Sequence, residues 1–176
     1  DAYKSLDEAL IHGGIFNKVK VNLIRIESDN LKTNDIRKKL KNVSGLLIPG
    51  GFGKRGTEGK ISAIKYAREK NIPFLGICFG MQMAIIEFAR NKLKIKNAGS
   101  SELDKKCYPV IGLINEWDKN GKKIKGTDKS LGGTMRLGLY EAKLRNNSAI
   151  NKIYNSKSIK ERHRHRYEVN NNLKSQ

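Results

Sequence analysis

A short turn that carries one cysteine constrains the fold of this chain more than any other segment. The turn is Gly76-Ile77-Cys78-Phe79-Gly80, and it ends an apolar run over residues 72–77 that is typical of a buried strand in a parallel sheet. Beyond the cysteine, apolar residues recur with helical spacing at Met81, Ala84, Ile85 and Phe88. This spacing predicts a helix from about Phe79 to Asn91 with that face buried. A strand, a tight turn and a helix are therefore expected in succession.

The place of Cys78 in this turn is typical of a nucleophile. Gly-x-Cys-x-Gly between a strand and a helix has the form of a nucleophile elbow, in which small residues permit a strained turn at the carboxyl end of the strand. A helix N-terminus beneath the sulfur would favour the thiolate, because its unpaired N–H groups carry partial positive charge. The alternative interpretation is a buried structural cysteine, the commonest kind of free cysteine. The local pattern favours the nucleophile.

Helices and strands alternate along the first half of the chain. A capping box at residues 5–8 predicts a short helix to about His12, which Gly13-Gly14 ends. The pattern then predicts a strand over Val19–Ile26, a helix from Thr33 or Asn34 through Lys41, a strand over Val43–Ile48, and a helix over Thr57–Lys70 with Ile61, Ile64, Tyr66 and Ala67 inward. We expect one α/β domain whose doubly wound, mostly parallel sheet has helices on both faces.

A glycine-rich loop follows the second predicted strand. Residues 49–56 contain four glycines, which would let backbone N–H groups approach a ligand closely, as an oxyanion hole requires. The loop resembles a phosphate-binding loop only in part, because it has no Gly-Lys-Ser/Thr ending. Ligands of such sheets bind beyond the carboxyl ends of the strands, so this loop and the Cys78 turn should share one edge.

The second half of the chain is less regular. Tyr108–Ile114 is a predicted strand, and residues 118–130 form a predicted polar loop. Basic residues beside the glycines of residues 132–138 favour either a mobile anion-binding flap or an ordinary solvated loop. The basic residues are Lys125, Lys129 and Arg136.

A basic run, Arg162-His163-Arg164-His165-Arg166, stands near the end. As a strand it would place His163 and His165 on one face. Either histidine is a candidate base for Cys78, with Glu168 as the orienting acid, since His12 is the only other histidine. We predict no metal site, because no further His or Cys cluster accompanies the pair. A basic surface strand is the alternative.

The formal charge of +19 at pH 7 suggests nucleic-acid binding as a function. The 26 lysines and 10 arginines, however, are spread along the whole chain, which is typical of a general surface bias. We therefore expect no nucleic-acid partner. The two cysteines stand in different contexts and predict no disulfide, and no stretch has the character of a membrane span or signal peptide. A cytoplasmic location is expected.

Four segments together resemble a known family. They are Pro49-Gly50-Gly51-Phe52-Gly53, Gly76-Ile77-Cys78-Phe79-Gly80-Met81-Gln82, Gly132-Gly133-Thr134-Met135-Arg136-Leu137-Gly138 and the run from Arg162 to Asn170. All four are similar to segments of the class I glutamine amidotransferase domains of CTP synthases, and the resemblance extends from Asp1 to about Leu173. It implies a flavodoxin-like three-layer fold. It also implies hydrolysis of L-glutamine through a thioester on Cys78, with the ammonia passing to a synthase domain that uses ATP and Mg²⁺ to aminate UTP.

The resemblance also implies roles for other residues. Those matching the glutamine-binding positions are Gly51, Phe52, Phe79, Gly80, Met81, Gln82, Glu102 and Arg166. Family members are activated by GTP, which the resemblance places near Arg55, Lys129 and Arg136. No cofactor is expected in the glutaminase domain itself. A homotetrameric parent enzyme and the synthase domain are the implied partners.

The chain also departs from the family pattern. The family's catalytic His and Glu lie in a Phe-His-Pro-Glu motif, which these residues do not contain, so His163 and His165 are not the expected base. A further strand and the synthase domain are expected ahead of Asp1. We therefore predict an incomplete glutaminase domain over residues 1–176 that alone is weakly active or inactive. A related α/β cysteine hydrolase or chaperone, or a basic nucleic-acid-binding module, are the alternatives.

Overall fold

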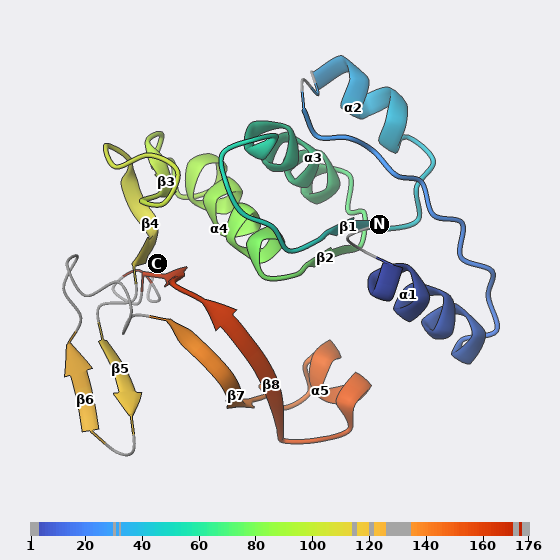
Figure 1. The fold of residues 1–176 in the computed structure, drawn as a ribbon. Coiled ribbons are helices and arrows are strands. Elements are labelled where there is room, and N and C mark those ends of the chain that lie inside the picture. The colour runs from blue at the N-terminus through green and yellow to red at the C-terminus, as the bar shows by residue number, and fades with distance from the viewer. Residues whose placement is uncertain are drawn as a thin grey trace.

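The computed structural model describes residues 4–29, 31, 33–113, 116–119, 122–125, 135–170 and 173. Helices and strands are both present, which confirms the α/β class (Figure 1). The helices are α1 (Lys4–Phe16), α2 (Thr33–Leu40), α3 (Thr57–Glu69), α4 (Phe79–Asn91) and α5 (Ala149–Tyr154). Those predicted near residues 33, 57 and 79 are confirmed almost to the residue.

The described strands form four small sheets. The strands are β1 (Leu46–Ile48), β2 (Phe74–Gly76), β3 (Ala98–Ser100), β4 (Tyr108–Leu113), β5 (Glu116–Lys119), β6 (Lys122–Lys125), β7 (Arg136–Lys143), β8 (Ser158–His165) and β9 (Tyr167–Val169). β1 pairs with β2 and β3 with β4, both in parallel, as the alternation of helices and strands predicted. The pairs β4–β9, β5–β6 and β7–β8 are antiparallel. Figure 1 shows the β7–β8 ribbon extending away from the helices, with α5 at its far end.

Two predicted elements were wrong. Residues 19–26 are not a strand: they are extended without a ladder, and Ile24 is 65% exposed. The segment predicted as a polar loop from Asp118 contains strand backbone instead, in the β5–β6 hairpin, while residues 126–130 lie outside the described part. The Asn120-Gly121 pair between β5 and β6 is a hairpin signal that outweighs the polar composition.

The sequence predicted that helix α1 ends at Gly13-Gly14. The helix instead continues to Phe16. Gly14 is buried, and a Cβ there would lie 2.7 Å from the side chain of Val21 and 2.8 Å from the carbonyl oxygen of Val19. The glycine therefore serves close packing rather than termination, because the chain after α1 folds back across the helix at this point.

The buried face of α4 also differs from the prediction. Met81 and Phe88 are 41% and 46% exposed, whereas Phe79, Met83 and Ile86 are buried. Apolar residues surround much of this helix, so helical spacing alone does not select the inward face. The choice comes from packing: α4 lies against α3 on one side and against β3 and β4 on the other, and its buried residues form the main core. That core also contains Ile48, Ile61, Ile64, Ala98, Val110 and Ile111.

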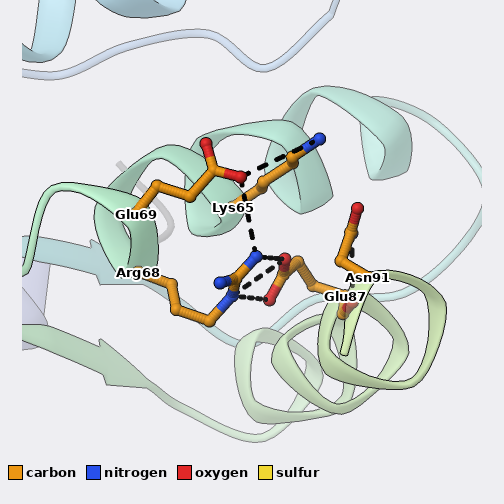
Figure 2. A network of polar contacts seen from close by, with 5 residues as sticks. All are labelled: Lys65, Arg68, Glu69, Glu87 and Asn91. Carbon is orange, nitrogen blue, oxygen red and sulfur yellow. Dashed lines mark hydrogen bonds and ion pairs between the residues drawn. The ribbon is translucent and has the colours of Figure 1, made fainter. Parts of the chain in front are cut away.

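A buried ion pair joins α3 to α4 (Figure 2). The guanidinium of Arg68 donates to both carboxylate oxygens of Glu87, over 2.8 to 3.2 Å, and the Glu87 side chain is only 1% exposed. The hydrogen bond to Glu87 is the main cause of a raised Arg68 pKa. Replacing Arg68 would cost about 3–5 kcal/mol, because it would leave the buried Glu87 carboxylate without its partner. Lys65 and Glu69 extend the network toward solvent.

The start of α4 lies directly against β1. The backbone of Gly80 approaches the carbonyl group of Ile48 so closely that a Cβ on Gly80 would overlap the Ile48 oxygen. The same oxygen accepts a hydrogen bond from the N–H of Ile77 at 3.0 Å. Only glycine at position 80 allows the strand, the turn and the helix to pack at this distance.

Replacing Gly80 with alanine should therefore destabilise the fold by about 1–3 kcal/mol, the cost of overpacking against rigid backbone. Urea unfolding followed by circular dichroism measures the change. Gly13→Ala is the matched control, since a Cβ there meets nothing within 4 Å and alanine favours the helix. Equal stability of the two variants would contradict this account of the turn.

Candidate active site

Cys78 lies at the junction between β2 and α4, in a strained backbone conformation. Its φ of 52° and ψ of −104° fall in a region that non-glycine residues rarely adopt. A Cβ on Gly76 would lie 2.7 Å from the backbone of Gly80 and Met81, so glycine is required there too. Cys78 is exposed, which makes the thiol accessible. The strained turn predicted from Gly-x-Cys-x-Gly is confirmed.

Backbone hydrogen bonds hold this turn in place. The N–H of Gly80 donates to the carbonyl of Ile77 at 2.9 Å, and the N–H of Gln82 donates to the carbonyl of Cys78 at 3.2 Å. Cys78 is thus the N-cap of α4, and the N–H groups of the first helical turn begin at Phe79. A helix N-terminus stabilises negative charge, so an oxyanion formed beside Cys78 would be favoured here.

The glycine-rich loop after β1 lies beside this turn, as the shared sheet edge predicted. A Cβ on Gly50 would stand 3.6 Å from the Cβ of Cys78, and one on Gly51 would stand 3.8 Å from the ring of Phe79. The next residue, Phe52, is 88% exposed. Because Gly50 and Gly51 have no side chains, the backbone of the loop can approach the Cys78 turn closely.

Glu102 follows β3, in the turn that leads to β4. Its N–H donates to the hydroxyl oxygen of Ser100 at 3.3 Å, which fixes the start of the turn. Glu102 as a whole is exposed, but desolvation of its carboxyl raises the pKa of that group. A carboxylate in such surroundings gains from a cationic partner such as an ammonium group.

Arg166 lies between β8 and β9, at the point where the chain reaches α4. The next residue, Tyr167, accepts a hydrogen bond through its carbonyl from the Nε2 of Gln82, at 2.9 Å. Gln82 is buried, so this contact ties the segment that follows the basic run to α4, the helix that begins after Cys78. Strand β9 also pairs with β4, with Tyr167 opposite Leu113.

His163 and His165 lie on one face of β8, as predicted. Nδ1 of His163 is 2.9 Å from Nε2 of His165, and Nδ1 of His165 is 3.1 Å from the Tyr167 carbonyl oxygen. Burial lowers the pKa of His165. Their hydrogen bonds are with each other and with the backbone rather than with Cys78, so the base first considered from the sequence has no support in the described contacts.

Of the three residues that the resemblance links to GTP, two lie within the part of the chain that the structure describes. Arg55 forms an ion pair with Asp29, and Arg136 forms one with Glu168 at 3.3 Å. The guanidinium of Arg136 also lies 5.2 Å from the centre of the Tyr140 ring. Lys129 lies outside the described residues. Both described arginines therefore already have carboxylate partners.

The structure adds contacts that the sequence pattern did not single out. The Tyr167 carbonyl is one, because a backbone acceptor leaves no sequence signal. The structure also contains a pocket of about 200 Å³ that the sequence did not predict. Its lining includes Lys54, Thr57, Arg90, Ser100 and Cys107, and Cys78 is not part of it. No set of three or more His, Cys, Asp or Glu side chains in the described ranges is arranged to bind a metal ion. None of the described helices has the length and apolar character of a membrane span.

Comparison with known proteins identifies relatives of this arrangement. The family model for class I glutamine amidotransferases matches residues 1–176. The chain is 78% identical over 170 residues to the CTP synthase of Pelagibacter ubique, covering 97% of this chain and 32% of that protein. It is 54% identical over 173 residues to the CTP synthase of Zymomonas mobilis, again covering 97% and 32%. It thus spans about a third of the length of these curated relatives.

A solved structure is similar as well. The glutaminase domain of the Trypanosoma brucei CTP synthase with bound acivicin superposes with a TM-score of 0.84 and 34% sequence identity. The match covers 99% of this chain and 65% of that one. Acivicin is bound in that protein.

The two cysteines should react at different rates with iodoacetamide. Cys78 is exposed, whereas Cys107 is half-buried and burial raises its pKa. We expect alkylation of Cys78 to be at least about tenfold faster at pH 8, because only an accessible thiolate reacts. Mass mapping of the two peptides over time measures the rates in the native protein, with urea-unfolded protein as the control. A faster reaction of native Cys107 would contradict the geometry of the turn.

Proposed function

The chain belongs to the class I glutamine amidotransferase family, and from that premise we propose that it is the glutaminase part of a CTP synthase. The observation that carries the proposal is Cys78, held exposed and strained between a strand and a helix N-terminus. This is the geometry that an attacking thiolate needs. The similarity to curated CTP synthases supports the choice of family branch.

The proposed reaction proceeds in two steps. The thiolate of Cys78 attacks the carbonyl carbon of the glutamine side-chain amide, and the resulting tetrahedral oxyanion expels ammonia as the C–N bond breaks. A γ-glutamyl thioester remains. Water then attacks the thioester carbonyl, releasing glutamate and restoring the thiol. The proton of the thiol must pass to a base and from that base to the departing nitrogen, which then leaves as ammonia; the family pattern places this base in a Phe-His-Pro-Glu motif that is not among these 176 residues.

Backbone N–H groups of Gly51 and Phe79 are the proposed donors to the oxyanion. Phe79 follows Cys78 at the start of α4, and Gly51 lies on the glycine-rich loop beside the ring of Phe79. The carboxylate of Glu102 and the guanidinium of Arg166 are proposed to hold the α-ammonium and α-carboxylate of glutamine. Phe52, Gly80, Met81 and Gln82 complete the proposed binding residues. Gln82 acts partly through the backbone, since its side chain bonds Tyr167.

The whole protein would use the ammonia elsewhere. We propose a separate synthase domain of the same polypeptide that binds ATP and Mg²⁺ and aminates UTP to CTP, in a homotetrameric cytoplasmic enzyme. The glutaminase domain itself would need no cofactor. Arg55, Lys129 and Arg136 are the proposed GTP contacts; Arg55 and Arg136 would have to exchange their carboxylate partners for phosphate or base. We propose that the parallel pairs β1–β2 and β3–β4 belong to the doubly wound sheet expected of this family.

Glutamine hydrolysis by the full-length polypeptide that contains these residues tests the proposal. We expect release of glutamate and ammonia, and covalent labelling of Cys78 by a glutamine-like diazo ketone. Cys78→Ala should abolish both, with a loss of at least about 10³-fold in rate, while Cys107→Ala leaves both unchanged. Residues 1–176 alone should hydrolyse glutamine far more slowly than the full-length polypeptide. Undiminished hydrolysis by Cys78→Ala would sink the proposal.

The affinity for glutamine should depend on the protonation of Glu102. Since its pKa is raised, the carboxylate loses its charge at a higher pH than an ordinary glutamate as the pH falls, and KM should rise over that range. Glu102→Gln should raise KM about tenfold at neutral pH and remove this part of the pH dependence.

Asp104→Asn is the matched control, because Asp104 is an exposed carboxylate in the same turn that bonds the N–H of Lys106. Its KM and pH profile should follow the unchanged protein. A KM for Glu102→Gln that matches this control at every pH would exclude Glu102 from the glutamine site.

A further inference from the structure

The carbonyl oxygen of Tyr167 accepts two side-chain hydrogen bonds at once. One comes from Nε2 of Gln82 at 2.9 Å and the other from Nδ1 of His165 at 3.1 Å. Gln82 lies on α4 and His165 at the end of β8, so a single backbone oxygen connects the helix of the nucleophile to the antiparallel ribbon. Both donors are at least partly buried, which strengthens such bonds.

These contacts settle the protonation of the histidine pair. A carbonyl oxygen only accepts, so Nδ1 of His165 must carry a proton. Burial lowers the pKa of His165, which favours the neutral ring, and its Nε2 then has a free lone pair. Nδ1 of His163 lies 2.9 Å from this Nε2 and is the donor when the His165 ring is neutral. His163 therefore orients His165, and His165 orients the Tyr167 carbonyl.

The position of this oxygen in the chain gives the contacts a functional meaning. Tyr167 directly follows Arg166, and the N–H of Gln82 is bonded to the carbonyl of Cys78 at 3.2 Å. The shared acceptor is thus one residue from the proposed glutamine-binding arginine, and it is linked to Cys78 by two hydrogen bonds, both of them through Gln82. Strand β9 has only three residues, so it can form few backbone hydrogen bonds with β4. We therefore expect side-chain contacts to contribute to its position. The ion pair of Arg136 with Glu168 supports the same segment from the β7 side.

We propose that His165 and Gln82 are positioning residues that set the place of Arg166 relative to Cys78 by holding the carbonyl of Tyr167 from two sides. This inference rests on the proposed function, since it assigns Arg166 to the bound glutamine. Losing a donor should weaken glutamine binding more than it slows the chemical step, because Cys78 itself is held by the backbone of its turn.

Steady-state kinetics of the full-length polypeptide test the proposal. His165→Leu removes the donor at similar size and should raise KM for glutamine about tenfold, with kcat within about twofold. His165→Asn keeps an N–H near the position of Nδ1 and should restore KM to within about twofold of the unchanged protein. His12→Leu, on the exposed face of α1, is the control and should change neither constant.

Two kinetic outcomes would overturn the proposal: equal KM values for His165→Leu and His165→Asn, or a loss of kcat at unchanged KM. If the unchanged protein shows no Cys78-dependent hydrolysis, the proposed function fails first. The hydrogen bonds are then tested separately by ¹⁵N NMR of the imidazoles. We expect His165 with its proton on Nδ1 at pH 7 and a shifted Nδ1 resonance in Gln82→Leu, and a proton on Nε2 alone would overturn the arrangement whether or not the variants fold.

Discussion

The close contact between the backbone of Gly80 and the carbonyl of Ile48 determines where the rest of the site can lie. Because no side chain separates them, α4 begins directly against the end of β1, and the turn between β2 and α4 has to reverse within very few residues. The positive φ of Cys78 is the consequence. Strain of this kind persists only where surrounding packing over-determines it, and here a parallel strand pair on one side and a core helix on the other supply that packing.

The opposite part of α4 is held by charge rather than by close backbone packing. Glu87 is buried and bonded by Arg68 of α3, and Arg90 donates to the carbonyl of Ala98 in β3 at 2.7 Å while pairing with Glu58. A buried carboxylate is costly without such a partner, so Arg68 and Glu87 specify one relative placement of the two helices. Glycine contacts at the first turn and ionic contacts in the later turns thus fix α4 along its length, and with it the direction in which Cys78 is presented.

Local sequence signals predicted the parts of the site that depend on backbone geometry. The glycines around Cys78 and the apolar run before it were enough to predict the turn, and α3 and α4 follow from their spacing. What the sequence could not supply was the choice of buried face on α4, since Met81 and Phe88 have the same periodicity as Met83 and Ile86. The prediction of a strand over Val19–Ile26 failed for a related reason. Its alternating pattern suits a strand, but a strand also needs a paired neighbour, which no local pattern encodes. The resemblance to a family supplied the roles of Glu102 and Arg166, which their local patterns do not show.

The site therefore combines two kinds of support with different physical consequences. The nucleophile is positioned by sterics of the main chain, where an added methyl group meets rigid backbone and the cost appears as lost stability of the whole fold. In our proposal, the substrate side depends on a few hydrogen bonds to one carbonyl oxygen on a three-residue strand, and we expect a lost donor to leave the core intact and to move only a short segment. If the proposal holds, substitutions near Tyr167 change the affinity for the substrate without disturbing Cys78. The reverse is not possible, because any change in the turn at Cys78 also changes the packing of α4 on β1.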